Sequence, residues 1–428
     1  MIAKAFLSHK SQDKPLINAV ADALCRRGVI TWIDIQQLNI GNTLKEKLEA
    51  AIQNQTAFVI FISKEALESD WVNYELKEAI ELEKARKEWI LPVFLGNPKE
   101  LITASPLLKN NYMTEDNHVN RIGIPVTYPI IQAIENEAAV IADKLSKSIY
   151  NLIGIKDAHD INIAIDQRGT GSRTDEYSVP DDLAAFPTLV FRPDNKERDQ
   201  NETLTGKQWQ LVIQIIKNSL GNALGNTLHE KKVHILGNGQ LGYAFLLGKY
   251  FNRTNCTILY CYNMRHKTCF SNEGQDFTRL LPGGDDDCGR IIPLNGDDPV
   301  PISTDTRNYK KIALYVGKQN YVKDVILHIK VTEPAIPILF IELLKDKQLF
   351  TANEEVWQLA ANIIALLMRL KNKHDMKTVL LYCDLPFNVL ILIAANLPFE
   401  SNIDIRFMEY RKDLTGQQDY ERYTYLKL

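Results

Sequence analysis

Strand and helix patterns alternate along the first 150 residues of this 428-residue chain. Residues 57–62 form a wholly apolar run of β-forming side chains, whereas 15–26 carries apolar residues at helical spacing. Strands that alternate with helices form a parallel sheet covered on both faces. A longer amphipathic helix at 133–152 would complete this fold. We therefore predict an α/β domain over residues 1–155.

The rest of the chain carries one order of elements twice. Each copy consists of a helix, a strand, a second helix and a second strand. The first helix of each copy contains a tryptophan, Trp209 or Trp357, and the strands that follow are 231–238 and 377–384. These equivalent features lie 148 and 146 residues apart. A nearly constant offset across several elements indicates an internal duplication.

Such a duplication predicts two Rossmann-like halves, at about 181–308 and 309–428. One further strand is expected before each copy, at 188–192 and at 311–316. The segment 156–180 is polar, contains Gly and Ser, and shows no sustained periodicity. We interpret it as a linker between the two domains or as a surface excursion.

Composition and charge exclude several classes of protein. The net charge is −3, which is not the basic excess of a protein that binds long nucleic acids. The longest largely apolar runs, such as 335–344 and 389–397, are about half as long as the roughly 20 residues that a membrane span needs. The six cysteines show neither paired nor metal-ligand spacing. We therefore expect reduced thiols, no metal site, no membrane partner and a cytoplasmic location.

Four segments of the first domain resemble Toll/interleukin-1 receptor (TIR) domains. They are FLSHKSQDK at 6–14, WIDIQQLNIGNTLKEKLEAAI at 32–52, FVIFISKEALESDWVNYEL at 58–76 and ILPVFLG at 90–96. The second of these is similar to a TIR strand followed by the BB loop. The resemblance implies a flavodoxin-like fold. It also leaves two functions open, because some TIR domains cleave the bond between nicotinamide and ribose in NAD and others are scaffolds.

The TIR resemblance singles out Glu75. The essential glutamate of the TIR enzymes stands in a W-x-x-x-E arrangement, which Trp71 and Glu75 match. A fixed carboxylate near the ribose stabilises the positive charge that develops as nicotinamide leaves. Helical spacing places Glu75 in the apolar arc of 69–84, where a carboxylate loses hydration. Glu83 falls in the same arc, so the motif alone makes Glu75 the predicted catalytic residue.

Five other residues of this domain are predicted to bind NAD. Ser8, His9 and Lys10 follow the first strand, at the end of the sheet where ligands of open α/β folds bind. Lys10 would meet the phosphates, although a solvated loop is the alternative for all three. Asp34 would contact a ribose hydroxyl or cap a loop, and Trp71 would stack on a base or join the core. The resemblance also implies that the BB loop completes the site of a neighbouring copy.

The duplicated region resembles the SAVED domain, a sensor of cyclic oligonucleotides built from two fused CARF-like halves. The resemblance rests on 234–251, 311–319 and 379–397. It implies that helix N-termini near 239–242 and 386–388 offer unpaired N–H groups to phosphates. A solvated loop is the alternative for each candidate contact. The candidates for contact with the nucleotide are Asn238, Gln240, Asn263, Arg265, Lys318, Pro386 and Phe387.

Together the two resemblances imply a TIR-SAVED effector of CBASS-type anti-phage systems. A cyclic oligonucleotide, such as a cyclic tri-adenylate or a relative, would act as activator. It would drive self-association through both domains, into an oligomer or filament, and switch on NAD+ hydrolysis. NAD+ would then be the substrate rather than a cofactor, and its depletion would halt the infected cell. The alternative is a non-enzymatic TIR scaffold that recruits partners in response to a nucleotide.

Overall fold

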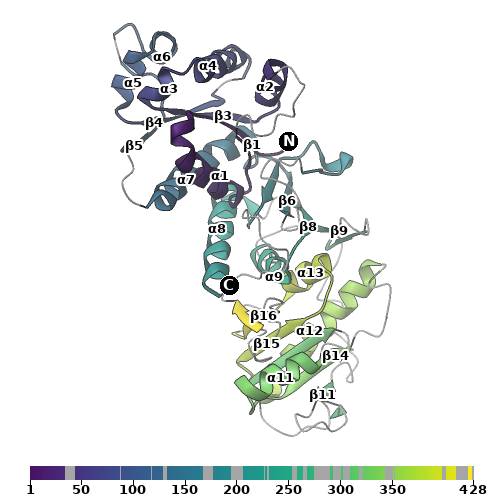
Figure 1. The fold of residues 1–428 in the computed structure, drawn as a ribbon. Coiled ribbons are helices and arrows are strands. Elements are labelled where there is room, and N and C mark those ends of the chain that lie inside the picture. The colour runs from purple at the N-terminus through teal and green to yellow at the C-terminus, as the bar shows by residue number, and fades with distance from the viewer. Residues whose placement is uncertain are drawn as a thin grey trace. The chain divides into compact units, whose positions relative to one another are not determined.

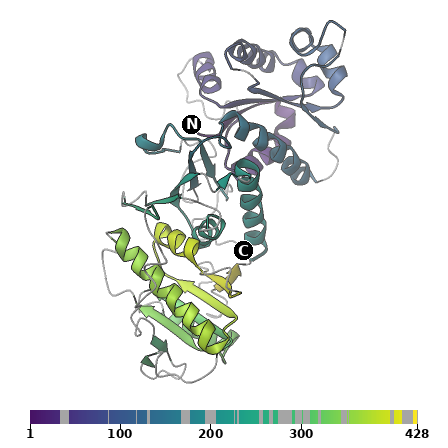
Figure 2. The same ribbon diagram turned by 180° about the vertical axis from the view of Figure 1, so that it is seen from behind.

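The chain divides into two compact units, each described below by itself. The first unit is Met1–Asn195 with Asn218–Gly225, and the second is Lys196–Lys217 with Asn226–Leu428. Figures 1 and 2 show the elements from opposite sides. The computed structural model describes residues 1–33, 44–86, 88–116, 118–128, 133–166, 177–193, 206–225, 227–228, 231–252, 258–263, 268–273, 290–292, 300–301, 309–317, 322–342, 350, 352–397, 402–410 and 423–426.

The first unit contains a parallel sheet in the order β2-β1-β3-β4-β5. This is the flavodoxin-like strand order, so the predicted fold class is confirmed. The central strand β3 is buried at every position because helices cover both faces of the sheet (Figure 1). The strands are β1 (Lys4–Ser8), β2 (Ile30–Trp32), β3 (Ala57–Ile62), β4 (Ile90–Leu95) and β5 (Ile124–Val126).

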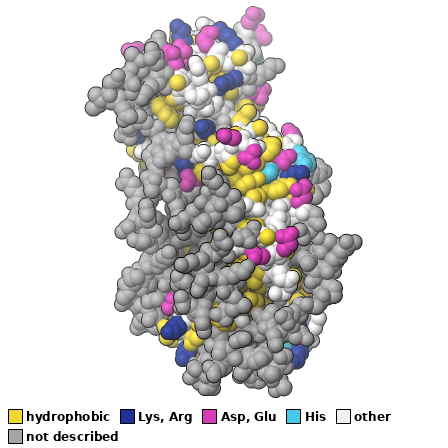
Figure 3. Space-filling view, turned by 90° about the vertical axis from the view of Figure 1, so that its right-hand side faces the viewer, with side chains coloured by type: hydrophobic (Ala, Val, Ile, Leu, Met, Phe, Trp, Pro, Cys, Tyr) yellow, Lys and Arg dark blue, Asp and Glu magenta, His cyan; other side chains and the backbone are white. Residues whose placement is uncertain are grey.

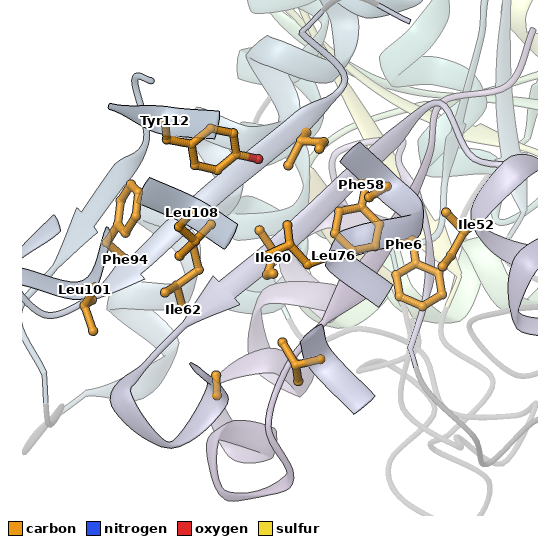
Figure 4. Close-up of a cluster of buried hydrophobic side chains, with 14 of the residues drawn as sticks. Phe6, Ile52, Phe58, Ile60, Ile62, Leu76, Phe94, Leu101, Leu108 and Tyr112 are labelled. Atoms are coloured by element: carbon orange, nitrogen blue, oxygen red, sulfur yellow. The ribbon is translucent and has the colours of Figure 1, made fainter. Parts of the chain in front are cut away.

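Helices α1 and α7 pack together on one face of this sheet, and α2 to α6 lie on the other. Figure 4 shows the core on the second face, where Phe6 stacks on Phe58 at 5.4 Å between ring centroids. Leu76 reaches this cluster from α4, which fixes that helix against the sheet. The helices are α1 (Lys14–Cys25), α2 (Leu44–Gln53), α3 (Lys64–Leu67), α4 (Asp70–Glu83), α5 (Pro98–Ala104), α6 (Pro106–Tyr112) and α7 (Ile134–Leu152).

The first unit also holds a parallel strand pair, β6 (Asp160–Asp166) and β7 (Thr188–Phe191). Strand β6 lies inside 156–180, so the prediction of a linker is wrong for those residues. Residues 161–165 are all buried, which makes β6 an interior strand. Its polar member Asn162 donates hydrogen bonds to the Leu183 carbonyl and to Thr188 Oγ1, both at 2.9 Å. A buried amide with such partners interrupts the apolar pattern without breaking the strand.

The second unit contains a seven-stranded sheet in the order β12-β11-β14-β13-β15-β16-β17. Strands β13 to β16 are parallel to their neighbours among themselves, and the outer strands pair antiparallel. The strands are β11 (Arg290–Ile292), β12 (Val300–Pro301), β13 (Lys311–Gly317), β14 (Ile338–Glu342), β15 (Thr378–Cys383), β16 (Asp404–Tyr410) and β17 (Tyr423–Leu426). The helices between them are α11 (Val322–Thr332), α12 (Asn353–His374) and α13 (Phe387–Asn396).

The predicted duplication is confirmed by the strand pairings. Besides β6 and β7, the first copy contains α8 (Gly206–Leu224), β8 (Lys232–Asn238), α9 (Leu241–Tyr250), β9 (Ile258–Asn263) and β10 (Thr268–Ser271). Strands β8 and β9 pair in parallel and β9 and β10 antiparallel, as β15, β16 and β17 do. The pair β6 and β7 likewise matches β13 and β14. Strand β7 was predicted to match 311–316, which is wrong because β6 is the equivalent of that strand.

Helices α9 and α13 are equivalent in the two copies and pack against each other within the second unit. A Cβ added at Gly248 would lie 2.6 Å from the Cβ of Ala394 and 2.4 Å from the carbonyl oxygen of Ile391. Gly248 and Ala394 lie 146 residues apart, which is the offset of the duplication. Equivalent residues therefore face each other, as they do at a two-fold axis. We infer a pseudo-two-fold axis between α9 and α13.

Candidate active site

The carboxyl end of β1 meets helix α4 at a hydrogen bond between two buried side chains. The Ser8 hydroxyl donates to Oε2 of Glu75, with 2.5 Å between the oxygens. Ser8 is the last residue of β1 and is 1% exposed, and Glu75 lies in the second turn of α4 and is 2% exposed. A carboxylate at this depth has lost most of its hydration. The hydroxyl replaces part of that hydration and fixes the orientation of the carboxylate.

The structure gives Glu75 and Glu83 different surroundings, a difference that the helical pattern could not reveal. Glu83 forms an ion pair with Arg121 at 2.6 Å and accepts a hydrogen bond from the backbone N–H of Ile90. These contacts give Glu83 a structural role beside β4. Glu75 instead faces the sheet edge where β1 ends. Its predicted position in the buried arc of the helix is confirmed.

The residues predicted beside Glu75 lie in different surroundings. His9 is buried, and its Nδ1 lies 3.1 Å from the carbonyl oxygen of Leu7. Lys10 is half-buried and precedes the short 3-10 helix η1 (Ser11–Asp13). Trp71 packs against the core cluster, with its ring 6.2 Å from that of Tyr74. Asp34 and the predicted BB loop at 35–43 lie outside the described residues.

Sequence reasoning missed Asp13, which joins three loops at this edge of the sheet. Its Oδ2 accepts a hydrogen bond from Ser63 Oγ at 3.0 Å, and its Oδ1 accepts one from the Tyr128 hydroxyl at 2.8 Å. Ser63 in turn caps α3 by accepting from the N–H of Ala66. Burial, together with the bond to Asp13, raises the pKa of Tyr128 to about 12. Asp13 thus ties the loops after β1, β3 and β5, although its position in the SHKSQD segment was the only sequence signal.

Some predicted nucleotide contacts of the second unit lie at two equivalent helix starts. Gln240 is the N-cap of α9, and Pro386, 146 residues later, is the N-cap of α13 with Phe387 buried behind it. The side chains of Asn238 and Asn263, together with all of Arg265 and Lys318, lie outside the described part of the chain.

Asn388, in the first turn of α13, lies in the predicted helix start 386–388 but was not among the predicted contacts. It is 1% exposed, and neither its Oδ1 nor its Nδ2 has a hydrogen-bond partner among the described residues. Burying an amide in this state costs free energy, so the side chain is a candidate for an external polar partner. In the sequence, only its position shortly after the N-cap Pro386 marks Asn388.

The described residues meet the requirements of neither a metal site nor a membrane-spanning helix. Within the described ranges, no cluster of three His, Cys, Asp or Glu side chains could hold a metal ion. No helix among those residues is long and apolar enough to cross a bilayer. On the face of the first unit that Figure 3 turns to the viewer, basic and acidic side chains are interspersed among the described residues.

Solved structures similar to this chain include SAVED/CARF-domain containing receptors. The Cap4 receptor of Acinetobacter baumannii with the cyclic trinucleotide 3'3'3'-cAAA matches at a TM-score of 0.42 and 12% identity, over 91% of this chain and 86% of that chain. The Cap4 receptor of Moraxella osloensis matches at a TM-score of 0.38 and 10% identity, over 96% of this chain and 97% of that chain.

Curated relatives match the N-terminal segment. The 2' cyclic ADP-D-ribose synthase AbTIR of Acinetobacter baumannii is 31% identical over 90 residues, which is 21% of this chain and 34% of that protein. The NAD(+) hydrolase TcpC of Escherichia coli is 32% identical over 76 residues, 18% of this chain and 25% of that protein. The chain thus spans about a third or less of these two relatives. The TIR domain family model matches residues 5–121, so the first unit contains a TIR domain.

Proposed function

We propose that the first unit cleaves the bond between nicotinamide and ribose in NAD+, with Glu75 as the catalytic carboxylate. The observation that carries this proposal is the buried hydrogen bond between Ser8 and Glu75 at the carboxyl edge of a parallel sheet. Relatives over this segment are named as an NAD(+) hydrolase and as a 2' cyclic ADP-D-ribose synthase. We propose hydrolysis, in which water captures the ribose.

The main requirement of this reaction is a fixed negative charge near the ribose. As the glycosidic bond stretches, its electron pair moves onto the pyridinium nitrogen, so nicotinamide leaves neutral and needs no acid. Positive charge develops on the ribose ring instead. The carboxylate of Glu75, held in a low-dielectric interior, stabilises that charge more than water does. Water then bonds to the ribose carbon and loses its proton, which yields ADP-ribose.

We propose further that the duplicated region binds a cyclic oligonucleotide, such as a cyclic tri-adenylate. The equivalent N-termini of α9 and α13 support this, because their first N–H groups attract phosphates. The buried amide of Asn388 supports it as well, since an amide pairs with the donor and acceptor of an adenine edge. Binding favours an assembled state, an oligomer or filament, in which the TIR domains cleave NAD+ as an anti-phage response.

The test uses purified full-length chain, NAD+ and a panel of cyclic di- and trinucleotides. Nicotinamide release is followed by chromatography, which also separates linear from cyclic ADP-ribose. Glu75→Gln should lower release by about a thousandfold or more, in line with the loss of a main electrostatic group. Glu81→Gln on the exposed side of the same helix should leave release unchanged. Activity that persists in Glu75→Gln would overturn the assignment.

A non-enzymatic scaffold is the competing function. It predicts that no nucleotide in the panel elicits nicotinamide release, while the nucleotide still binds and the chains still associate. Light scattering and calorimetry on the same samples separate this outcome from an inactive preparation, which would neither bind nor associate.

A further inference from the structure

Strand β7 has hydrogen-bonded neighbours on both of its edges within the first unit. One edge pairs with β6. On the other edge, every second residue from Thr188 to Arg192 donates its backbone N–H to a carbonyl of the N-terminal region. This spacing is expected because N–H groups two residues apart in a strand point the same way. These bonds are Thr188 N–H to Met1 O at 2.8 Å, Val190 N–H to Gly28 O at 3.0 Å and Arg192 N–H to Cys25 O at 3.0 Å.

The residues that β7 contacts precede β1 and β2, and the most distant of them, Cys25, is the last residue of α1. The Ala3 N–H donates to the Thr188 carbonyl at 3.0 Å, and β1 begins at the next residue and ends at Ser8. Gly28 lies two residues before β2, which pairs with β1 along its whole length. Strand β7 therefore holds β1 and β2 at their amino ends. The opposite end of β1 carries the hydrogen bond to Glu75.

The duplication assigns β7 to the second part of the chain rather than to the TIR domain. The pair β6–β7 is the equivalent of β13–β14, and the TIR domain match ends at residue 121. The strand that contacts the starts of β1 and β2 is thus part of the first repeat of the proposed sensor. Its contact is close, since a Cβ added at Gly28 would lie 3.0 Å from the Cβ of Leu189.

We propose that β7 couples the duplicated region to the Glu75 site. A displacement of the β6–β7 pair passes through these main-chain hydrogen bonds to β1, because a strand bonded along both edges moves as a unit. The shift changes the alignment of Ser8 with Glu75. The coupling rests on the proposed function, for which it supplies the regulation. Thermodynamically, the nucleotide needs only to bind more tightly to the arrangement in which Glu75 is aligned.

Gly28→Ala tests the coupling, with Gly154→Ala as its matched control. Both glycines have positive φ, +82° and +65°, so alanine strains the backbone at either position. Only at Gly28 does the new Cβ press on β7, since no atom lies within 4 Å of a Cβ at Gly154. Binding of labelled cyclic tri-adenylate should stay within about twofold in both variants. Activation of nicotinamide release should fall by tenfold or more in Gly28→Ala alone, and equal activation in both variants would overturn the proposal.

Hydrogen–deuterium exchange of the wild-type chain gives a readout independent of NAD+ and of any folding defect. Binding of cyclic tri-adenylate should change exchange over Met1–Ser8 and over the amides of Thr188 and Val190. Such a change without nicotinamide release under any condition would support the coupling and overturn the proposed enzyme. Release that depends on the nucleotide, with unchanged exchange over Met1–Ser8, would overturn the coupling and leave the enzyme standing.

Discussion

Replacing Ser8 by alanine removes the hydroxyl that donates to Glu75 and leaves the carboxylate buried. A hydrogen bond to a charged group contributes about 1.5–3 kcal/mol. Since about 1.4 kcal/mol corresponds to a tenfold change in rate, kcat should fall by about 10- to 150-fold if this bond aligns Glu75 in the transition state. The KM for NAD+ should change little, because the hydroxyl is bonded to the carboxylate in the structure. Ser8 is then a positioning residue.

Direct binding of NAD+ by Ser8 predicts the opposite kinetic pattern, a raised KM with kcat retained. Steady-state nicotinamide release at a saturating activator, with NAD+ varied, separates the two roles. Ser11→Ala is the matched control, because Ser11 lies exposed in the same loop. A kcat within twofold of wild type in Ser8→Ala, with a normal KM, would refute both roles.

The same bond can be measured without any activity. In the wild-type background, Ser8→Ala should lower the free energy of unfolding by about 1.5–3 kcal/mol, whereas in Glu75→Gln the loss should be about 0.5–1.5 kcal/mol because the acceptor is neutral. Denaturant unfolding of the four proteins in this double-mutant cycle gives the coupling energy. Equal losses in the two backgrounds would show that Ser8 does not interact with the charge of Glu75.

Four further substitutions test other parts of the structure. Asp13→Asn keeps one oxygen acceptor for two hydroxyls, those of buried Ser63 and exposed Tyr128, and removes the charge from the acceptor. It should cost about 1–3 kcal/mol of stability, and an unchanged melting temperature would contradict that. Gly248→Ala should cost about 1–3 kcal/mol through overpacking of α9 on α13. Gly221→Ala in α8, where no atom lies within 4 Å of the new Cβ, should instead gain about 0.5–1 kcal/mol. Asn388→Leu removes an unsatisfied amide and should stabilise the free protein by about 1–3 kcal/mol while weakening nucleotide binding, and thermal unfolding with and without cyclic tri-adenylate measures both.

Much of the first unit could be predicted because its strands are continuous apolar runs. The sequence of β3 is apolar at every position, which predicts a fully buried strand, and every residue of β3 is buried in the structure. The failure at β6 has one physical cause. Asn162 is a polar residue inside an interior strand, and its Nδ2 donates to Leu183 and Thr188, which are more than twenty residues away in the chain. No local pattern can reveal partners at that distance.

The candidate site was predictable only where a motif marked it. Glu75 was found through the W-x-x-x-E arrangement, and its burial agrees with the helical pattern. The bond from Ser8 to Glu75 joins residues 67 positions apart, and the role of Asp13 depends on Ser63 and Tyr128. Such roles arise from parallel strands whose ends meet at one edge of the sheet. The roles of Asp34, Arg265 and Lys318 stay predictions.

The pseudo-two-fold axis bears on the kind of nucleotide that the second unit would bind. A duplicated half within one chain can diverge from its partner, which identical subunits around a true two-fold axis cannot do. At the helix starts, Gln240 is the equivalent of Pro386, and the equivalent of the buried Asn388 is Gly242. The two halves therefore present different groups at matching positions. A cyclic dinucleotide with two identical halves would pair well with the groups of one half of the protein and poorly with those of the other. A cyclic trinucleotide has no two-fold symmetry and so does not need identical groups in the two halves. We accordingly expect cyclic tri-adenylate to bind more tightly than cyclic di-adenylate. Calorimetry that ranks the two affinities the other way would count against the proposed contact between Asn388 and the nucleotide.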